Sequence, residues 1–484
     1  MRSSLFLKKA LITVVFGISA LSAADRVAFA QVGSLIPSPP KNAFYCDPVR
    51  GSMKGNGSKA KPWGRFQDVI AANLINGQDP TKGVIHAGDI VYLMSGNHGI
   101  WSMTPYSGQF ANTDFITVQA FPGNTPIVQS VTLMDSSKWV FRGLTITNPP
   151  VLDQYASLLL LTRVKNVIAD QNRIFSAPDL TNYTTNDWIN KVADYGITVD
   201  GIGVQAVTLS NNSIYNIRSG MGLAGDNILV QGNSIDYFCD DGIDFAASNL
   251  VIRRNSITNH YGQVQDSLHA DGMQGTESFG EVNNNVLIDS NIVLASTGKY
   301  AAIPPLVPGL GQDGFQGIGA FDGLWNNVVV TNNVVGSTAY DGMTWFGISN
   351  SVLANNTLIT QSSSPVITTW LSVWSSKVGL PPKNVIVRNN IANRFSLYPG
   401  VTHDHNLSLS SNQTNFLPTE FIVTDPTKIF VLYNPSQAKF DLRLIGGSPA
   451  IGAGTSQSAP RLDILGNVRN QAKIDLGAFS YTGQ

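Results

Sequence analysis

Four Asp-Gly pairs recur in the middle of the chain, each beside a short apolar stretch. A carboxylate can transfer a proton, coordinate a hard cation or bind a polar substrate, whereas several carboxylates at one place repel one another. One Asp-Gly pair alone indicates only a turn. If the pairs stack on strands ~4.8 Å apart, they form a column of carboxylates that needs a proton, a cation or a substrate. The column consists of Asp241, Asp271, Asp313 and Asp341.

Further polar residues extend this candidate site on both sides. Asp240 stands directly before Asp241, and His269 stands two residues before Asp271, with which it would form an acid–base pair. Three positions after the aspartates, on the side that we expect to face outward, stand Asp244, Gln274, Gln316 and Thr344.

Two chemistries suit such a column. A calcium ion held by oxygen ligands on adjacent strands would bridge the protein and the carboxylate of an acidic sugar. Neutralising that carboxylate acidifies its α-proton, so that a base removes it and β-elimination follows. Alternatively, two of the aspartates would act as general acid and base in glycoside hydrolysis, with burial and repulsion keeping one protonated.

A short repeat determines which elements carry these residues. An Asn is followed by alternating apolar residues and by a second Asn six positions later, and the copies at Asn227 and Asn249 are 22 residues apart. Alternation at period two predicts strands, and so short a unit buries its apolar face only by stacking on its neighbours. The second Asn would form a hydrogen-bonded ladder at a turn, where left-handed dihedrals suit it. Its members are Asn172, Asn212, Asn233, Asn255, Asn291, Asn333, Asn356 and Asn390.

The repeat resembles that of right-handed parallel β-helix proteins, and the resemblance implies an all-β solenoid of that hand. The segment from Tyr45 to Ala72 is similar to the N-terminal cap of secreted β-helix proteins. GGSPAIGAG and IDLGAF near the end are similar to the closing segment of those that act on polysaccharides. We therefore expect an N-terminal cap and the first coils over residues 31–137. The parallel β-helix repeats that carry the site should follow over 138–400, and the last coils with a closing segment over 401–484.

The start of the chain has the features of a secretory signal peptide over residues 1–30: basic residues, an apolar run and the small-x-small triplet ending at Ala30. We expect a secreted or periplasmic protein without a membrane anchor after cleavage. The formal net charge of −1 gives no reason to expect a nucleic-acid partner.

The segment CDDGIDF resembles the calcium-binding motif of the family 9 pectate lyases, and it implies Asp240, Asp241 and Asp244 as calcium ligands. Two positions depart from that family. Its further Asp falls near Ser219, and its catalytic Lys falls near Gln274. The polygalacturonases share the Asp-Asp pair and a nearby His, but their motifs do not occur here in the same order.

We therefore expect an exported β-helix enzyme that acts on a polysaccharide, most of all a calcium-assisted lyase of an acidic polysaccharide. A glycoside hydrolase, a uronate epimerase and a non-catalytic glycan-binding protein are the alternatives. The expected catalytic residues are His269, Asp271, Asp313 and Lys299, with Arg254 as a further candidate base. The expected substrate-binding residues are Gln274, Gln316, Asp341, Arg254 and Trp345.

Overall fold

The computed structural model describes residues 37–75, 83–103, 112–147, 156–262, 270–276, 282–300, 314–362 and 366–483. The expected signal peptide and two expected catalytic residues, His269 and Asp313, lie outside these ranges. Within the described ranges, no helix combines the length and the apolar character needed to cross a membrane.

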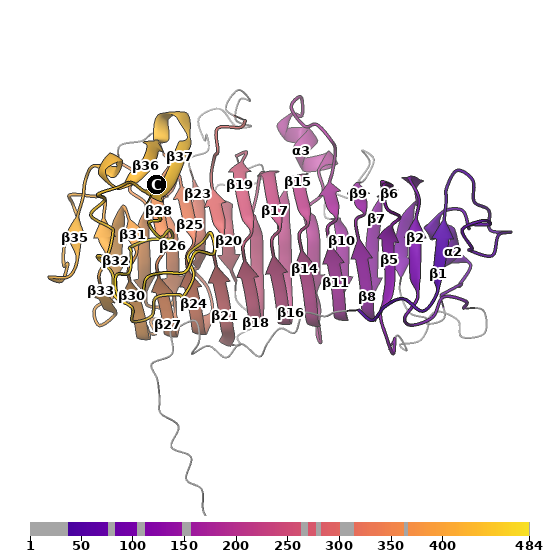
Figure 1. The fold of residues 1–484 in the computed structure, drawn as a ribbon, viewed down its shortest axis with the longest axis horizontal. Coiled ribbons are helices and arrows are strands. Elements are labelled where there is room, and N and C mark those ends of the chain that lie inside the picture. Colours follow the sequence, from indigo (N-terminus) through magenta and orange to yellow (C-terminus); the bar gives the residue numbers. More distant parts are fainter. Residues whose placement is uncertain are drawn as a thin grey trace, which may run out of the picture.

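The chain winds into a right-handed parallel β-helix, elongated along one axis, with strands stacked coil upon coil (Figure 1). This confirms the expected fold class. A 22-stranded sheet contains two series of parallel strands that join where the long strands β16 and β18 run through both. The first series is β4 (Ile100–Met103), β7 (Ser130–Met134), β10 (Ser157–Thr162), β13 (Tyr195–Asp200), β16 (Ser219–Gln231), β18 (Ile243–Arg253), β20 (Ala270–Gly275), β23 (Phe315–Ala320), β26 (Asp341–Phe346), β29 (Trp370–Trp374) and β32 (Arg394–Leu397).

The other strands complete each coil. The second series of the large sheet is β1 (Ala43–Cys46), β2 (Ile90–Leu93), β5 (Ile116–Ala120), β8 (Ser137–Arg142), β11 (Lys165–Asp170), β14 (Gln205–Ser210), then β16 and β18, β21 (Val282–Asp289), β24 (Leu324–Thr331), β27 (Ile348–Ala354), β30 (Lys383–Arg388) and β33 (Thr402–Asp404). A 13-stranded sheet contains β3 (Gly96–Asn97), β6 (Pro126–Val128), β9 (Thr145–Thr147), β12 (Arg173–Phe175), β15 (Ser213–Ile217), β17 (Ser234–Phe238), β19 (Ser256–His260), β22 (Ile292–Leu294), β25 (Val334–Ser337), β28 (Thr357–Thr360), β31 (Ile391–Ala392), β34 (Leu407–Ser408) and β35 (Phe421–Ile422).

The expected asparagine ladder is present and fully buried. In each step, the backbone N–H and the side-chain amide of one Asn both donate to Oδ1 of the next, as from Asn255 to Asn291 at 2.9 and 3.0 Å. The ladder continues one step further than expected, to Asn406. The left-handed dihedrals fall one residue before the ladder, for example at Asn332 (φ 55°) before Asn333. The ladder residue itself is therefore selected for its amide and not for its backbone conformation.

Further elements cover the first coils and one side of the last coils. The helix α2 (Phe66–Ala71) packs Phe66 edge-on against Trp101 of the first coils. The hairpin of β36 (Phe430–Asn434) and β37 (Lys439–Leu444), with the short helices η1 (Pro426–Lys428) and η2 (Pro435–Gln437), packs over the 13-stranded sheet of the C-terminal coils. The chain then runs back along the turns, where Asn355 and Asn389 donate to backbone oxygens of Asp475 and Thr455.

A column of glycines fixes the corner at which the first series of strands begins. A side chain on Gly242 would overlap the backbone oxygen of Gly272, and one on Gly317 would overlap that of Gly342. Neighbouring coils therefore approach closely at this corner, which positions the residues beside it. The column is Gly196, Gly220, Gly242, Gly272, Gly317 and Gly342.

Candidate functional site

The strand register brings three of the four expected aspartates to one position of the coil, with one coil that carries Gln316 between the second and the third. Ile243 pairs with Met273, Met273 with Ile318, and Ile318 with Met343. The residues two positions earlier on these strands are Asp241, Asp271, Gln316 and Asp341.

The predicted register at Asp313 was therefore wrong by three residues. Gln316 pairs with Asp271 and occupies the place that was expected for Asp313. The reason is that this coil has two glycines, Gly314 and Gly317, either of which could belong to the glycine column. Gly317 is the one that stacks against Gly342, whereas Gly314 has a left-handed φ of 120° and open space around it. The same shift affects the outer column of Asp244, Gln274 and Thr344, in which Gln316 was expected. Gly319 takes that place, since it pairs with both Gln274 and Thr344.

Asp241 lies just before β18 and Asp244 lies on it, and the two form a carboxylate pair whose members interact electrostatically. The Tyr195 hydroxyl, two coils away, donates to Oδ2 of Asp244 at 2.7 Å, and the backbone N–H of Asp271 donates to Oδ1 of Asp241 at 2.7 Å. Oδ1 of Asp244 is buried and receives no hydrogen bond from any protein donor within the described ranges.

The surroundings of the pair raise the pKa of both carboxyl groups. Burial, followed by the charges of Asp244 and Asp271, raises the pKa of Asp241 well above its usual range. Burial also raises the pKa of Asp244 to about 6, against the opposing effect of its hydrogen bonds from Tyr195 and Asp241. Asp271 is only 1% exposed, so it acts on the pair from below the surface. Asp241 and Asp244 are themselves partly exposed.

Asp240 has a different role from its two neighbours. The buried guanidinium of Arg218 lies 3.1 Å from Oδ2 of Asp240 and 3.3 Å from Oδ1 of Asp194. This ion-pair cluster secures the corner beneath the carboxylate pair. In the part of the chain that the structure describes, no three or more His, Cys, Asp or Glu side chains are arranged to hold a metal ion. The structure thus does not bring Asp240, Asp241 and Asp244 together as one ligand set, and calcium stays a prediction.

Three expected site residues lie elsewhere. Lys299 forms an ion pair with Asp236 and lies over the ring of Tyr300, on the exposed side of the 13-stranded sheet. Arg254 is exposed in the turn after β18, at the far end of that strand from the pair. Trp345 is fully buried in the core, edge-on to Trp325. The expectation that Trp345 contacts a sugar was therefore wrong, because its position on β26 points inward.

A groove continues from the acidic column toward the C-terminal coils, with a volume of about 580 Å³. Asp341 forms part of its wall, where Oδ1 accepts hydrogen bonds from Thr344 (2.6 Å) and from the indole of Trp370 (2.8 Å). Trp370 was not among the expected site residues, because its strand lacks an Asp-Gly pair to set the register. The groove is lined by Gln316, Phe321, Asp341, Phe346, Trp370, Ser372, Trp374, Lys377 and Ser396.

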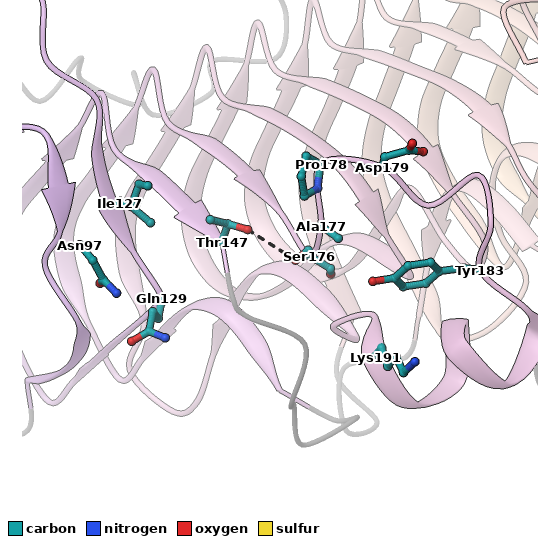
Figure 2. A pocket seen from close by; sticks show the side chains of 10 residues that line it. All are labelled: Asn97, Ile127, Gln129, Thr147, Ser176, Ala177, Pro178, Asp179, Tyr183 and Lys191. Atoms are coloured by element: carbon teal, nitrogen blue, oxygen red, sulfur yellow. Dashed lines mark hydrogen bonds between the residues drawn. The ribbon is translucent and has the colours of Figure 1, made fainter.

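A second hollow, of about 530 Å³, lies on the other sheet (Figure 2). Thr147 and Ser176 form its floor, and Tyr183 and Lys191, at the two ends of the segment that contains α3 (Thr185–Lys191), lie beside it. It lacks the paired carboxylates of the first site, so we take the carboxylate pair and its groove as the candidate functional site.

Comparisons with known proteins agree with this architecture. A family model described as "Right handed beta helix region" matches residues 131–303. The pectate lyase Pel9A is 16% identical, with a TM-score of 0.45 over 92% of this chain and 97% of that chain. A lacto-N-biosidase of family GH136 from Eubacterium ramulus is 12% identical, with a TM-score of 0.45 over 79% of this chain and 66% of that chain. The surface adhesin PfbA of Streptococcus pneumoniae is 11% identical, with a TM-score of 0.41 over 71% of this chain and 86% of that chain. No curated protein matches the chain. At these identities, the likeness concerns the fold alone.

Proposed function

We propose that this protein is a polysaccharide lyase that cleaves a uronate-containing chain by β-elimination at Asp241 and Asp244. The observation that carries the proposal is the pair itself: Asp244 accepts from Tyr195 and Asp241 accepts from the Asp271 backbone N–H, each at 2.7 Å, and burial raises the pKa of both carboxyl groups. Elimination needs a base and an acid, and two neighbouring carboxyl groups with raised pKa values supply both.

The reaction balances with these two groups alone. The ionised carboxylate of the pair accepts the proton α to the uronate carboxyl group, and the electron pair of that C–H bond forms the new C=C bond. The C–O bond to the leaving sugar breaks, and the protonated carboxyl donates its proton to that oxygen. The proton balance of the pair is restored when the two carboxyls exchange a proton, directly or through water.

The uronate carboxylate must be neutralised for its α-proton to be acidic enough. Gln274 lies one coil from Asp244 in register, and Gln316 lies beside Asp271. Their amide N–H groups are donors that suit a carboxylate. The calcium ion implied by the CDDGIDF resemblance would supply the same neutralisation by its charge when bound.

Glycoside hydrolysis is the second candidate, and the spacing of Asp241 and Asp271 favours it. Side chains at one position on adjacent coils are ~4.8 Å apart, close to the ~5–5.5 Å that separates the two carboxyl groups of retaining glycosidases. Against it stands the burial of Asp271, which is 1% exposed and therefore badly placed to attack a sugar.

The test measures absorbance at the unsaturated-uronate band on polygalacturonate, alginate and neutral xylan, with and without EDTA. We expect a rise on one acidic polymer that Asp241→Asn and Asp244→Asn abolish, and that the exposed control Asp200→Asn retains. New reducing ends without absorbance would favour hydrolysis instead. Loss of the rise in EDTA, with recovery on adding calcium, would support the calcium requirement.

We also propose that the chain is exported and cleaved after Ala30, as the N-terminal features predict. N-terminal sequencing of the protein recovered from periplasm or medium tests this, and an intact Met1 would contradict it.

A further inference from the structure

From the second coil after the carboxylate pair onward, four successive coils carry an aromatic residue at one repeated position. Phe346 pairs in register with Trp374. Phe321 directly follows the pair Ala320–Trp345, which places it beside Phe346, and Tyr398 directly follows Leu397, the partner of Val373. Phe321 and Phe346 meet edge to face with ring centroids 5.6 Å apart, and Trp374 and Tyr398 do so at 5.8 Å.

Small residues form a floor next to this row. Asp244 pairs with Gln274, and from there the same position on successive strands passes to residues with short side chains or none. The floor is therefore low from the carboxylate pair to the C-terminal coils. Its members are Gly319, Thr344, Ser372 and Ser396.

The opposite wall is polar. It continues the acidic column through Gln316 and Asp341. Trp370 pairs with Asp341 on the next coil, and Arg394 pairs with Trp370 on the coil after that. Oε1 of Gln316 is buried and has no hydrogen-bond partner within the described ranges. This unsatisfied acceptor lies where the acidic column reaches the groove. Aromatic row, low floor and polar wall together form one channel, which we call the aromatic channel.

The rings of the channel are held in place before anything binds. The indole N–H of Trp374 donates to Ser396 Oγ at 2.9 Å, and that of Trp370 donates to Asp341 at 2.8 Å. Tyr340 stacks on Trp370 with centroids 5.3 Å apart. Trp374 nevertheless remains 40% exposed. A large apolar ring that is fixed by its own polar edge and left open to solvent is well suited to bind a ligand with an apolar face.

We infer that the aromatic channel binds the part of the polysaccharide that extends beyond the cleaved bond. A sugar ring presents C–H groups on its faces and hydroxyls on its rim, which match an aromatic row on one side and amide and carboxylate groups on the other. Four coils span ~14 Å, which accommodates a short oligosaccharide and not a single ring alone. The inference rests on the proposed function for the identity of the substrate, and the shared wall of Gln316 and Asp341 makes the two sites continuous.

The test separates binding from catalysis by using the inactive Asp241→Asn protein as background. Affinity electrophoresis through gels containing polygalacturonate, alginate or xylan measures retention of this protein. We expect one polymer to retard it, and Trp374→Ala and Phe346→Ala to weaken that retention at least tenfold. Ile202→Ala, which removes an apolar side chain that is 95% exposed and outside the channel, should leave it unchanged.

In the active protein, Trp374→Ala should raise KM for the polymer at least tenfold while kcat changes little, and trimers of the same sugar should be affected less. Retention that depends on Trp374, without any elimination, would support the channel and overturn the proposed reaction. Elimination with an unchanged KM in Trp374→Ala, or retention by no polymer, would overturn the channel. Trp374 is exposed, and an unchanged melting temperature confirms that the variant is folded.

Discussion

Replacing Asp244 with Asn should stabilise the folded protein at pH 8 and leave its stability unchanged at pH 4. The pKa of Asp244 is about 6 in the folded protein, above its ordinary value of 3.8. The folded state therefore holds this proton more tightly than the unfolded chain does. The resulting stabilisation is complete below pH 4 and is lost as the pH rises through about 6.

The size of the effect follows from that shift. About two pKa units at ~1.4 kcal/mol each give about 3 kcal/mol, and contact of this partly exposed carboxyl with solvent reduces the figure to about 2 kcal/mol. Asn preserves the arrangement, because its oxygen still accepts from Tyr195 and its amide can donate to Asp241. The substitution therefore removes the charge without removing the contacts.

Differential scanning calorimetry at pH 4 and pH 8 measures the change. A chain of this length unfolds with an entropy of ~1 kcal/mol/K, so about 2 kcal/mol corresponds to a melting temperature about 2 °C higher at pH 8. Asp200→Asn removes an exposed negative charge from the same sheet and should give no such gain. An equal gain at both pH values, or an equal gain from Asp200→Asn, would refute the idea that the folded protein raises the pKa of Asp244.

Three further predictions concern the surroundings of the pair. Tyr195→Phe removes the hydroxyl that favours the ionised form of Asp244, so the acid limb of the pH–rate profile should move up by about one unit. Arg218→Met leaves two partly buried carboxylates without their cation and should cost about 3 kcal/mol in denaturant unfolding, where an unchanged midpoint would contradict the ion-pair cluster. Asn291→Ala breaks the ladder at its centre and should cost about 3 kcal/mol, whereas an exposed Asn190→Ala should cost almost nothing.

The sequence predicted those parts of the fold that repeat at fixed spacing. The second Asn of each repeat recurs because its amide must meet the next amide, so the ladder could be found by counting from Asn172 to Asn390. An Asp-Gly pair is less informative. The sequence around it does not tell whether the glycine stacks on the glycine of the next coil or lies in a turn. At residues 313–317 the turning glycine was mistaken for the stacking one, and the register shifted by three.

Other parts of the site could not be predicted because coil lengths vary. Arg218 and Asp240 meet because the chain between them forms one short coil of 22 residues, a length that the sequence does not mark. Trp370 and Trp374 face outward, whereas Trp345 faces the core. Only the strand register distinguishes the outward tryptophans from the inward one. Burial and hydrogen bonding across coils depend on that register, which the alternation of apolar residues alone leaves open.

The glycine column explains why these carboxylates have unusual pKa values. Because Gly242 and Gly272 allow neighbouring coils to approach closely, the residues just before them are brought within one strand spacing of each other. Burial, together with the charges of Asp244 and Asp271, then raises the pKa of Asp241. Where the same position carries Gln316 and Trp370, this repulsion is absent and the surface becomes a polar and aromatic wall. One structural device thus accounts for a cluster of carboxylates at one end of a face and for a polar and aromatic groove at the other.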